Sequence, residues 1–457
     1  MSKVFVRDRE FYKLLLALGL PIVLKNLIVN SVGMADNLMV AALGEAATNG
    51  AQMANQLTNF LFTITMNVSA AVTVLATQYW GKRETKSIKT LAGIGLKFSM
   101  ALGVAAFILG FFFPDFTLGL FTNDAQAIEA GRGYLRIVAW TYLIYSVTDV
   151  LVAVMTSVEN VRLGLVASMS ASLTNMVLNY LLIYPVGSVK LMGFTVRTIG
   201  LGLGVRGAAL GTSGGALIAG LLMLRVLFSK RRAISIGVRD DYRPDKVIVR
   251  QMLYLSVPVM FERISISFGQ ILTSALATGL GTAALAAHQL ANTGESICYM
   301  PAFGFGIAVT TLVAQSAGAG REDLKHEYAR LCMIYDLMIM CTMAALMYVF
   351  APQLMGFFIA DAAVIKAGAV LLRIQTFAEP CLAVNYVATG IMRGEGDTKW
   401  PFLIAVIGMW AVRLPLSFLF VKGFGLGLEF LWVAMACDWI SRAVLCWIRL
   451  KKGRRTF

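Results

Sequence analysis

The sequence predicts an all-α polytopic membrane protein, with twelve transmembrane helices in two six-helix lobes related by a pseudo-two-fold axis along the membrane normal. Three observations lead to this fold class: the composition, the number of apolar runs and an internal repeat. The chain is 58% apolar and 14% charged, with a mean hydropathy of +0.73. Soluble domains average roughly 45–50% apolar and 25% charged residues. The composition therefore indicates a chain that lies largely in lipid.

Apolar runs separated by short polar breaks give the positions of the expected helices. A membrane helix needs about 20 mainly apolar residues. Only helices satisfy the backbone of such runs, because the alternating pattern of barrel strands is absent. The expected spans cover 14–40, 50–77, 90–113, 133–157, 164–186, 205–228, 248–277, 285–315, 328–350, 367–391, 400–421 and 427–448.

The second half of the chain repeats the first at a single offset of 237 residues. Gly44 matches Gly281, and the register continues without a gap as far as 135–137 against 372–374. Because each half has an even number of spans, both halves enter the membrane in the same sense, which makes the repeat parallel. The register is lost where 184–206 forms a longer outer hairpin.

The basic residues indicate the lobe boundaries and the orientation. Of 40 Lys and Arg residues, 27 fall in one alternating set of connections and six in the other. The positive-inside rule therefore predicts a plasma-membrane protein with both termini cytoplasmic. We expect an N-lobe over 1–230, a basic cytoplasmic linker over 231–247 and a C-lobe over 248–457. The net charge of +15 is then a topology signal, so we expect no nucleic-acid partner.

Polar residues within the N-lobe spans are candidates for ion coupling. Asp36 is the leading one, because a carboxylate in a low-dielectric pocket can exchange a proton or bind sodium. Its alternative is an acid at the outer interface, close to water. Asn175 and Asn179 lie four residues apart on one helix face and can complete a site with Asp36 or simply join two helices. Lys25 lies near the midplane of the first span.

Two glutamates are the C-lobe candidates. Glu262 lies at the depth of Lys25 in the repeat frame and can attract a cation. Its alternative is an ion pair with Arg263 or with Lys25. Glu379 precedes Pro380, which frees a nearby backbone carbonyl, and a carboxylate beside such a carbonyl can ligate a hard cation. Sodium at Asp36 or Glu262 is the only metal expected.

The remaining motifs argue against catalysis. The chain has no Walker A or HExxH motif, and its two histidines form no Cys/His cluster. Asp149 is a weaker candidate, while Asp438 and Arg442 have the i, i+4 spacing of a structural pair. A membrane enzyme or scaffold would need clustered acids or a nucleophile in one cleft. We therefore expect an ion-coupled secondary transporter, with no enzyme activity and no resident cofactor.

Several motifs resemble the multidrug and toxic compound extrusion (MATE) family. They are GTAALAAHQLANTGES, PAFGFGIAVTTLVAQSAGAGRED, MRGEGDTKWP, GMWAVRLPLSFLF and DWISRAVLCWIRLKKG in the second half, and MADNLMVAALG in the first. The resemblance covers nearly the whole chain. It implies an antiporter that exports organic cations, by alternating access, against inward sodium or proton flow.

By motif position, the resemblance also assigns site residues. Asp36 is similar to the family's N-lobe acid, and Asn175 and Asn179 to its fifth-helix polar pair. Glu262 matches the seventh-helix glutamate, whereas Glu379 is only near the tenth-helix acid. The expected partners are a small organic cation and membrane lipid, and we expect a monomer.

Three departures from the family pattern leave a second reading open. Asn179 stands where some proton-coupled members carry Asp, SVENVRLG at 157–164 replaces an RGxGDT-like turn, and Lys25 aligns with Glu262 in the repeat. The alternative function is a flippase for lipid-linked oligosaccharides or another lipid, of the same superfamily. A flippase cleft would need several basic residues, and only Lys25, Arg263 and Arg413 lie deep enough.

Overall fold

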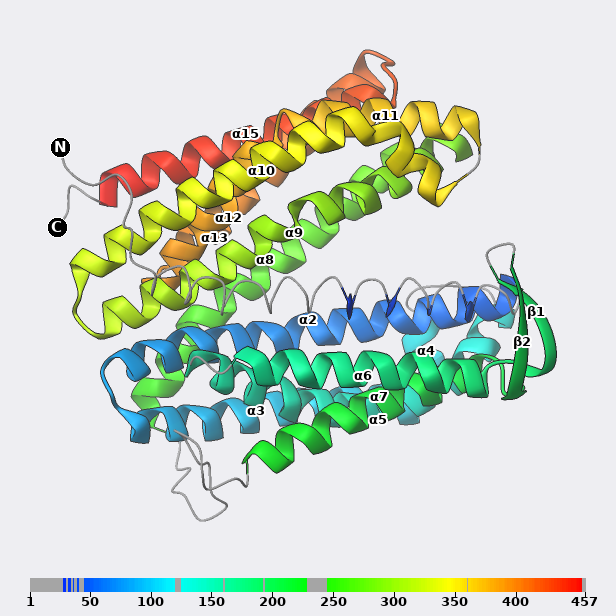
Figure 1. Ribbon diagram of the computed structural model, residues 1–457, viewed down its shortest axis with the longest axis horizontal. Coiled ribbons are helices and arrows are strands. Elements are labelled where there is room, and N and C mark those ends of the chain that lie inside the picture. Colours follow the sequence, from blue (N-terminus) through cyan, green and yellow to red (C-terminus); the bar gives the residue numbers. More distant parts are fainter. Residues whose placement is uncertain are drawn as a thin grey trace. The chain divides into compact units, whose positions relative to one another are not determined.

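The chain is almost entirely helical in the computed structural model (Figure 1). The first expected span lies largely outside the described residues, and the residues described there are helical. The chain forms two compact units, and the boundary between them lies between Leu253 and Tyr254, inside helix α8 (Lys246–Thr278). The structure describes residues 28–29, 32–33, 36, 39–40, 45–119, 125–158, 161–191, 194–227, 245–359 and 361–453.

The first unit is a helix bundle whose longest helix, α2, packs against α5. Helix α3 also packs on α5, and α6 packs along α7. Its core surrounds the buried side chains of Tyr134, Leu135 and Leu118. The helices are α2 (Glu45–Gly81), α3 (Thr85–Phe112), α4 (Pro114–Gly119), α5 (Ala125–Ser157), α6 (Val161–Leu182) and α7 (Val205–Leu227).

The longer connection between α6 and α7 is a two-stranded antiparallel ribbon, β1 (Pro185–Leu191) and β2 (Phe194–Leu201). Val186 pairs with Ile199 across the ribbon, and both side chains are exposed. This agrees with the expectation of a longer hairpin over 184–206. It is the region in which the two halves of the repeat lose their register.

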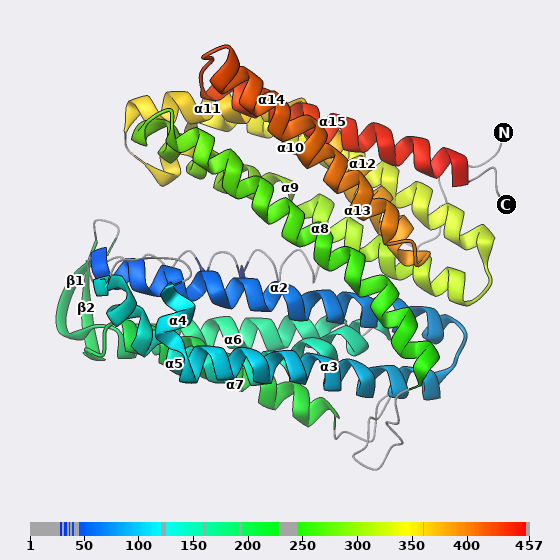
Figure 2. The ribbon, with the colours of Figure 1, turned by 180° about the vertical axis from the view of Figure 1, so that it is seen from behind.

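The second unit is organised around α9 and the fully buried Trp432 of α15, whose indole nitrogen donates to His288 Nδ1 at 3.0 Å. Figure 2 shows the helices of this unit from behind. They are α8 (Lys246–Thr278), α9 (Thr282–Gly318), α10 (Glu322–Phe358), α11 (Ala362–Thr376), α12 (Glu379–Gly394), α13 (Lys399–Val406), α14 (Leu414–Phe418) and α15 (Leu428–Gly453), with π-helical segments η1 (Ile407–Arg413) and η2 (Leu419–Gly423).

Two expected spans of this unit are less regular than the sequence predicts. The span at 367–391 is not one helix: α11 and α12 meet at a bend of 54°. Pro380, at the start of α12, has no backbone N–H to continue the hydrogen bonding of α11. The span at 400–421 is interrupted by η1 and η2. Such π-helical turns are rare and often mark functional positions.

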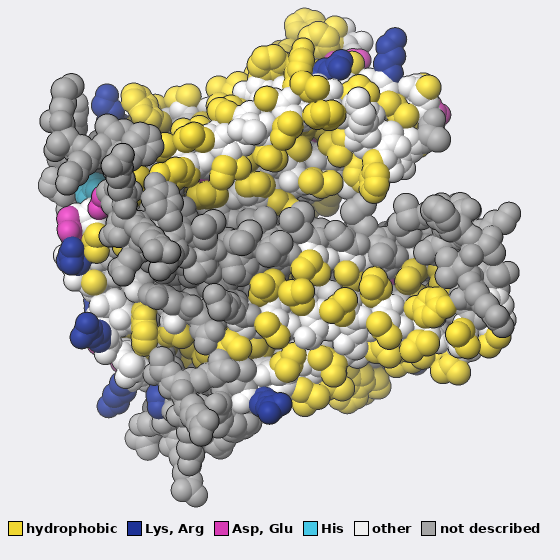
Figure 3. Space-filling model, viewed as in Figure 1, with side chains coloured by type: hydrophobic (Ala, Val, Ile, Leu, Met, Phe, Trp, Pro, Cys, Tyr) yellow, Lys and Arg dark blue, Asp and Glu magenta, His cyan; other side chains and the backbone are white. Residues whose placement is uncertain are grey.

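The helix surfaces are suited to lipid. Within each unit, apolar side chains cover much of the face in Figure 3, and the Lys and Arg side chains visible on it lie mainly toward its edges. Large apolar side chains such as Phe116, Phe268 and Trp447 are at least 60% exposed. Among the described residues, eight helices are long and apolar enough to cross a membrane, or nine if α11 and α12 form one span. This exposure is a feature of membrane interaction.

Candidate functional site

The first unit joins Asp36 to the two asparagines of α6. Asn179 donates through Nδ2 to Asp36 Oδ1 at 2.5 Å and to Asn175 Oδ1 at 3.4 Å. Asn175 in turn donates to Thr212 Oγ1 on α7 at 3.3 Å. The i, i+4 spacing of the asparagines therefore directs both amides toward one set of partners. Three predicted candidates lie together in this cluster, which we call the amide cluster.

Two further polar residues extend the amide cluster. The hydroxyl of Tyr134 on α5 donates to Asn55 Oδ1 on α2 at 2.9 Å. Tyr134 is 1% exposed, and it interacts with Asp36 and with the Thr212 hydroxyl. The sequence reasoning did not select Tyr134, whose ring looks like one of many packing aromatics. Asn55 could have been selected from the sequence, because the same residue type, Asn292, occupies the matching position of the repeat.

The oxygen atoms of the amide cluster allow it to bind a proton or a small cation. Asp36 is partly buried, and Asn179 is 1% exposed. Asn179 Oδ1 has no hydrogen-bond partner among the described residues. A carboxylate next to neutral amide and hydroxyl groups can hold a proton, and oxygen ligands also suit hard cations. No group of three or more His, Cys, Asp or Glu side chains that could hold a metal is found in the described part of the chain.

Glycines on α7 allow this helix to approach α6 closely. A Cβ atom at Gly211 would lie 2.0 Å from Asn179 Oδ1, and one at Gly215 would lie 2.5 Å from the carbonyl oxygen of Ala171. Both distances are far below van der Waals contact. The local sequence of α7 therefore determines where the Asn179 amide can lie.

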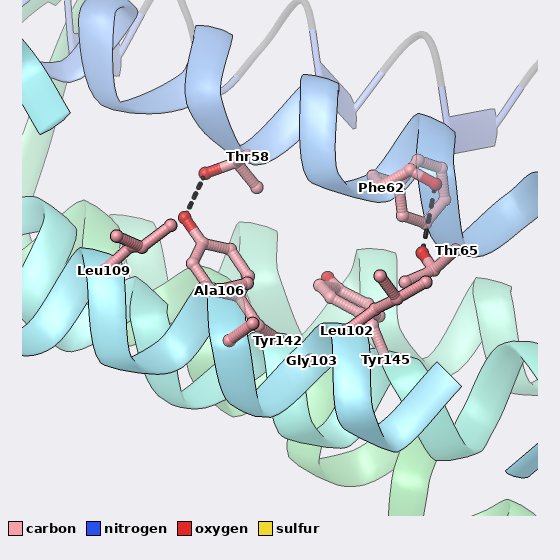
Figure 4. Close-up of a pocket in the computed structure, with 10 residues that line it drawn as sticks. Thr58, Phe62, Thr65, Leu102, Gly103, Ala106, Leu109, Tyr142 and Tyr145 are labelled. Carbon is pink, nitrogen blue, oxygen red and sulfur yellow. Dashed lines mark hydrogen bonds between the residues drawn. The ribbon is translucent and has the colours of Figure 1, made fainter. Parts of the chain in front are cut away.

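A cavity of about 100 Å³ lies beside the amide cluster's helices, between α2, α3 and α5 (Figure 4). The Tyr142 hydroxyl is 2.9 Å from Thr58 Oγ1, and Phe62 meets Tyr145 edge-on at 5.9 Å. Pockets for drug-sized ligands are about 300–1,000 Å³. This cavity alone is therefore too small for such a molecule. Its lining consists of Thr58, Phe62, Thr65, Leu102, Gly103, Ala105, Ala106, Leu109, Tyr142 and Tyr145.

Glu262 in the second unit forms a two-oxygen ion pair. Arg393 donates through one terminal nitrogen to Glu262 Oε1 at 2.7 Å and Oε2 at 2.9 Å. The ion-pair partners of Glu262 expected from the sequence are Arg263 and Lys25. Arg393, at the end of α12, is the partner instead, and Lys25 lies outside the described residues. The charge of Glu262 is therefore compensated within its own unit.

Glu379 lies in a different environment, at the bend where α12 begins. It is 0% exposed, and neither carboxyl oxygen has a hydrogen-bond partner among the described residues. Glu295 of α9 interacts with it electrostatically and accepts a hydrogen bond from Gln375 Nε2 at 2.8 Å. Sequence reasoning missed Glu295, although it is the only charged residue in the whole of α9.

Arginine side chains flank these acids. Arg413, at the end of η1, is 6% exposed and interacts electrostatically with Glu295 and Asp438. The predicted pair of Asp438 and Arg442 is confirmed, with contacts of 2.5 and 2.8 Å. The buried positive charge of Arg413 is thus partly balanced by carboxylates of the same unit.

The turn after α12 connects three helices through charge. The first three charged residues of the MRGEGDTKWP motif each form an ion pair with a different helix. The pairs are Arg393 with Glu262 of α8, Glu395 with Lys325 of α10 at 3.1 Å, and Asp397 with Arg449 of α15 at 2.9 Å. We call this set the turn ion pairs. A motif that looked like a simple turn in the sequence therefore stabilises one end of the unit.

Comparison with known proteins agrees with this architecture. The MatE family model matches residues 21–181 and 258–419. The probable multidrug resistance protein NorM of Thermotoga maritima is 26% identical, covering 95% of this chain and 91% of its own length. The multidrug resistance protein PmpM of Pseudomonas aeruginosa is 23% identical, covering 99% and 94%.

Solved structures share the fold. A crystal structure of MATE in complex with MaL6 gives a TM-score of 0.88 at 19% identity, covering 97% of each chain. An outward-facing multidrug resistance MATE transporter also gives 0.88 at 19% identity, covering 97% of this chain and 96% of that one. The predicted all-α polytopic fold is therefore confirmed. The chain belongs to the MatE family, and it is an integral membrane transporter and not an enzyme.

Proposed function

We propose that this transporter exports organic cations, including drugs, in exchange for sodium ions or protons. The observation that carries the proposal is the hydrogen-bonded group of Asp36, Asn179 and Asn175, with the unpartnered oxygen of Asn179 beside it. A single carboxylate with neutral oxygens can bind a small cation or a proton. Relatives named as multidrug resistance proteins support the substrate class.

Coupling follows from competition for negative charge. A cation at Asp36 removes the charge that attracts an organic cation, so the two ligands exclude each other. Each ligand shifts the balance between inward-open and outward-open states by its differential affinity for them. We propose that the protein works as a monomer in the plasma membrane, with both termini cytoplasmic and no resident cofactor. Lipid is its only other partner.

The acidic side chains of the second unit differ in their capacity to bind a coupling ion. Glu262 is bound by Arg393, so it has less capacity for another cation than Glu379, which is buried beside Glu295. We propose Glu379 and Glu295 as the groups of this unit that respond to the coupling ion. Flipping of an anionic lipid-linked cargo is less well supported, because Arg413 interacts with two carboxylates instead of offering a free positive charge.

The test is gradient-driven efflux from liposomes that contain the purified protein and a fluorescent organic cation. A sodium gradient and a proton gradient are imposed separately on wild type, Asp36→Asn and Asp115→Asn. Asp115 is an exposed acid paired with Arg132 and is the matched control. We expect Asp36→Asn to lose coupled efflux and Asp115→Asn to keep it. Folded wild-type protein that moves no cation under either gradient would refute drug export.

A further inference from the structure

Asp336 of α10 is a buried acid that the proposed function does not use. Its side chain is 0% exposed, and neither carboxyl oxygen has a hydrogen-bond partner among the described residues. The buried acids Glu262 and Asp438 of the same unit have arginine partners. A lone carboxyl group in a closed apolar interface therefore needs a separate physical explanation.

The face of α10 that contains Asp336 is otherwise apolar. Met333, one turn before, packs with Met392 of α12, and Met340, one turn after, packs with Ala302 of α9 and with α12. Asp336 thus lies on the α10 face that packs against α9 and α12. Because this interface contains mostly aliphatic side chains, it offers little to stabilise a negative charge.

The ionisable groups of the neighbouring elements leave Asp336 without a counter-charge. Cys332 lies one turn away on α10, and on α9 the Tyr299 ring packs in the cluster that contains Leu337 and Met340, whereas no residue between Met300 and Ser316 is ionisable. Several basic groups of the surrounding elements bind other partners: Lys325 binds Glu322 and Glu395, Arg373 binds the Tyr348 carbonyl, Arg393 binds Glu262, Arg442 binds Asp438, and Arg449 binds Asp397. Arg330, also on α10, is exposed. The ionisable residues of α12 and α15 in the clusters around Met340 and Met333 are Tyr386 and Cys446.

The internal repeat supports a neutral group at this position. At the offset of 237, Asp336 corresponds to Ser99 of α3 in the first unit. Ser99 is also 0% exposed, and its hydroxyl has no hydrogen-bond partner among the described residues. The same place in the fold is thus closed to water in both units, and in one of them the side chain is uncharged.

We propose that Asp336 is a proton-binding site of the second unit, filled while α10 is packed on α9 and α12 and emptied only when this interface opens. An ionised carboxylate without a partner costs several kcal/mol in such a setting, whereas a protonated carboxyl costs much less. By linkage, loss of this proton then favours the open interface. The proposed proton site at Asp336 does not depend on Asp36, so it can be refuted without refuting the proposed export function, and the reverse also holds.

Cys332 offers a direct readout, because it is 0% exposed and lies on the same face as Asp336. Purified variants retain either Cys332 or Cys341 as the only cysteine, and their alkylation by N-ethylmaleimide is followed between about pH 6 and pH 9. Cys341 is exposed and is the matched control on the same helix. Ionisation of a thiol alone raises the rate at most about tenfold per pH unit.

We expect the rate at Cys332 to rise more than about tenfold per pH unit over part of this range, because opening adds to thiol ionisation. In the Asp336→Asn variant, we expect the alkylation rate of Cys332 to rise by no more than about tenfold per pH unit, which is also the limit expected for Cys341. Direct repulsion between an ionised Asp336 and the thiolate would lower the slope, so it cannot mimic the expected result. Equal slopes in wild type and Asp336→Asn would overturn the proposal.

A second variant guards against a folding defect. Asp336→Leu removes the titration while keeping an uncharged side chain of similar length. If the carboxyl is protonated in the packed state, both variants keep the wild-type thermal unfolding temperature at about pH 6 and exceed it at about pH 9. A large loss of stability in both variants at the lower pH would mean that the folded protein needs the ionised carboxylate, which also overturns the proposal.

Discussion

The substitution Gly211→Ala tests whether the geometry of the amide cluster matters for coupling. The added Cβ atom would lie 2.0 Å from Asn179 Oδ1 and 3.3 Å from the Asn175 carbonyl oxygen. The Asn179 amide is the more mobile of the two, so it rotates away and loses its hydrogen bond to Asp36. A hydrogen bond to a charged group contributes about 1.5–3 kcal/mol. Because this donor favours the charged, ion-free carboxylate, we expect the affinity of Asp36 for a coupling proton or cation to rise roughly ten- to hundredfold.

The assay is gradient-driven efflux from proteoliposomes, with the concentration of coupling ion varied. Gly33→Ala is the control, because a Cβ atom at Gly33, three residues before Asp36, meets nothing within 4 Å among the described residues. We expect Gly211→Ala to need much less coupling ion for half-maximal efflux, and Gly33→Ala to resemble wild type. Wild-type ion dependence in a folded Gly211→Ala protein would refute the assigned role of the Asn179 amide.

Two further substitutions test individual contacts. Arg393→Ala leaves Glu262 buried without its partner, and breaking such a pair costs about 3 kcal/mol or more. We expect a lower thermal unfolding temperature, largely restored by Glu262→Gln in the same chain; no recovery would contradict the ion-pair assignment. Tyr134→Phe removes the hydroxyl that donates a hydrogen bond to Asn55. A hydrogen bond of this kind contributes about 0.5–1.5 kcal/mol, so coupled efflux should fall by about tenfold or less while the fold is retained. Tyr142→Phe is the comparison, because it loses a similar hydroxyl, and an equal effect in both would argue against a specific role for Tyr134.

The helices were predictable because lipid imposes a simple rule on sequence. Long apolar runs must become helices, and positively charged loops mark one side. The ends of helices were less predictable: α10 extends from Glu322 to Phe358, well beyond the apolar run at 328–350. Polar residues continue a helix outside hydrocarbon at no penalty, so hydropathy alone underestimates its length.

The partners of the site residues were harder to predict than the residues themselves. The spacing of Asn175 and Asn179 gave a shared face, and the structure joins that face to Asp36. By contrast, Arg393 lies 131 residues from Glu262, and no local pattern connects them. Glu295 was hidden inside a family-like motif, although a single acid in a long apolar helix is itself a signal.

The repeat has a further physical meaning once contacts are compared between units. At the offset of 237, Thr58 corresponds to Glu295 and Tyr142 to Glu379. In the first unit the two hydroxyls are 2.9 Å apart, and in the second the two carboxyls interact electrostatically. The same pair of positions therefore meets in both units, with neutral groups in one and acids in the other.

The turn ion pairs differ between the units in the same way. The residues that correspond to Arg393, Glu395 and Asp397 in the first half are neutral: threonine, valine and asparagine. Among the described residues, one unit thus places Asp36 among amides and hydroxyls, whereas the other concentrates acids and arginines. Duplication of one helical frame can supply two sites of different charge, because the packing positions are retained while the polar positions diverge.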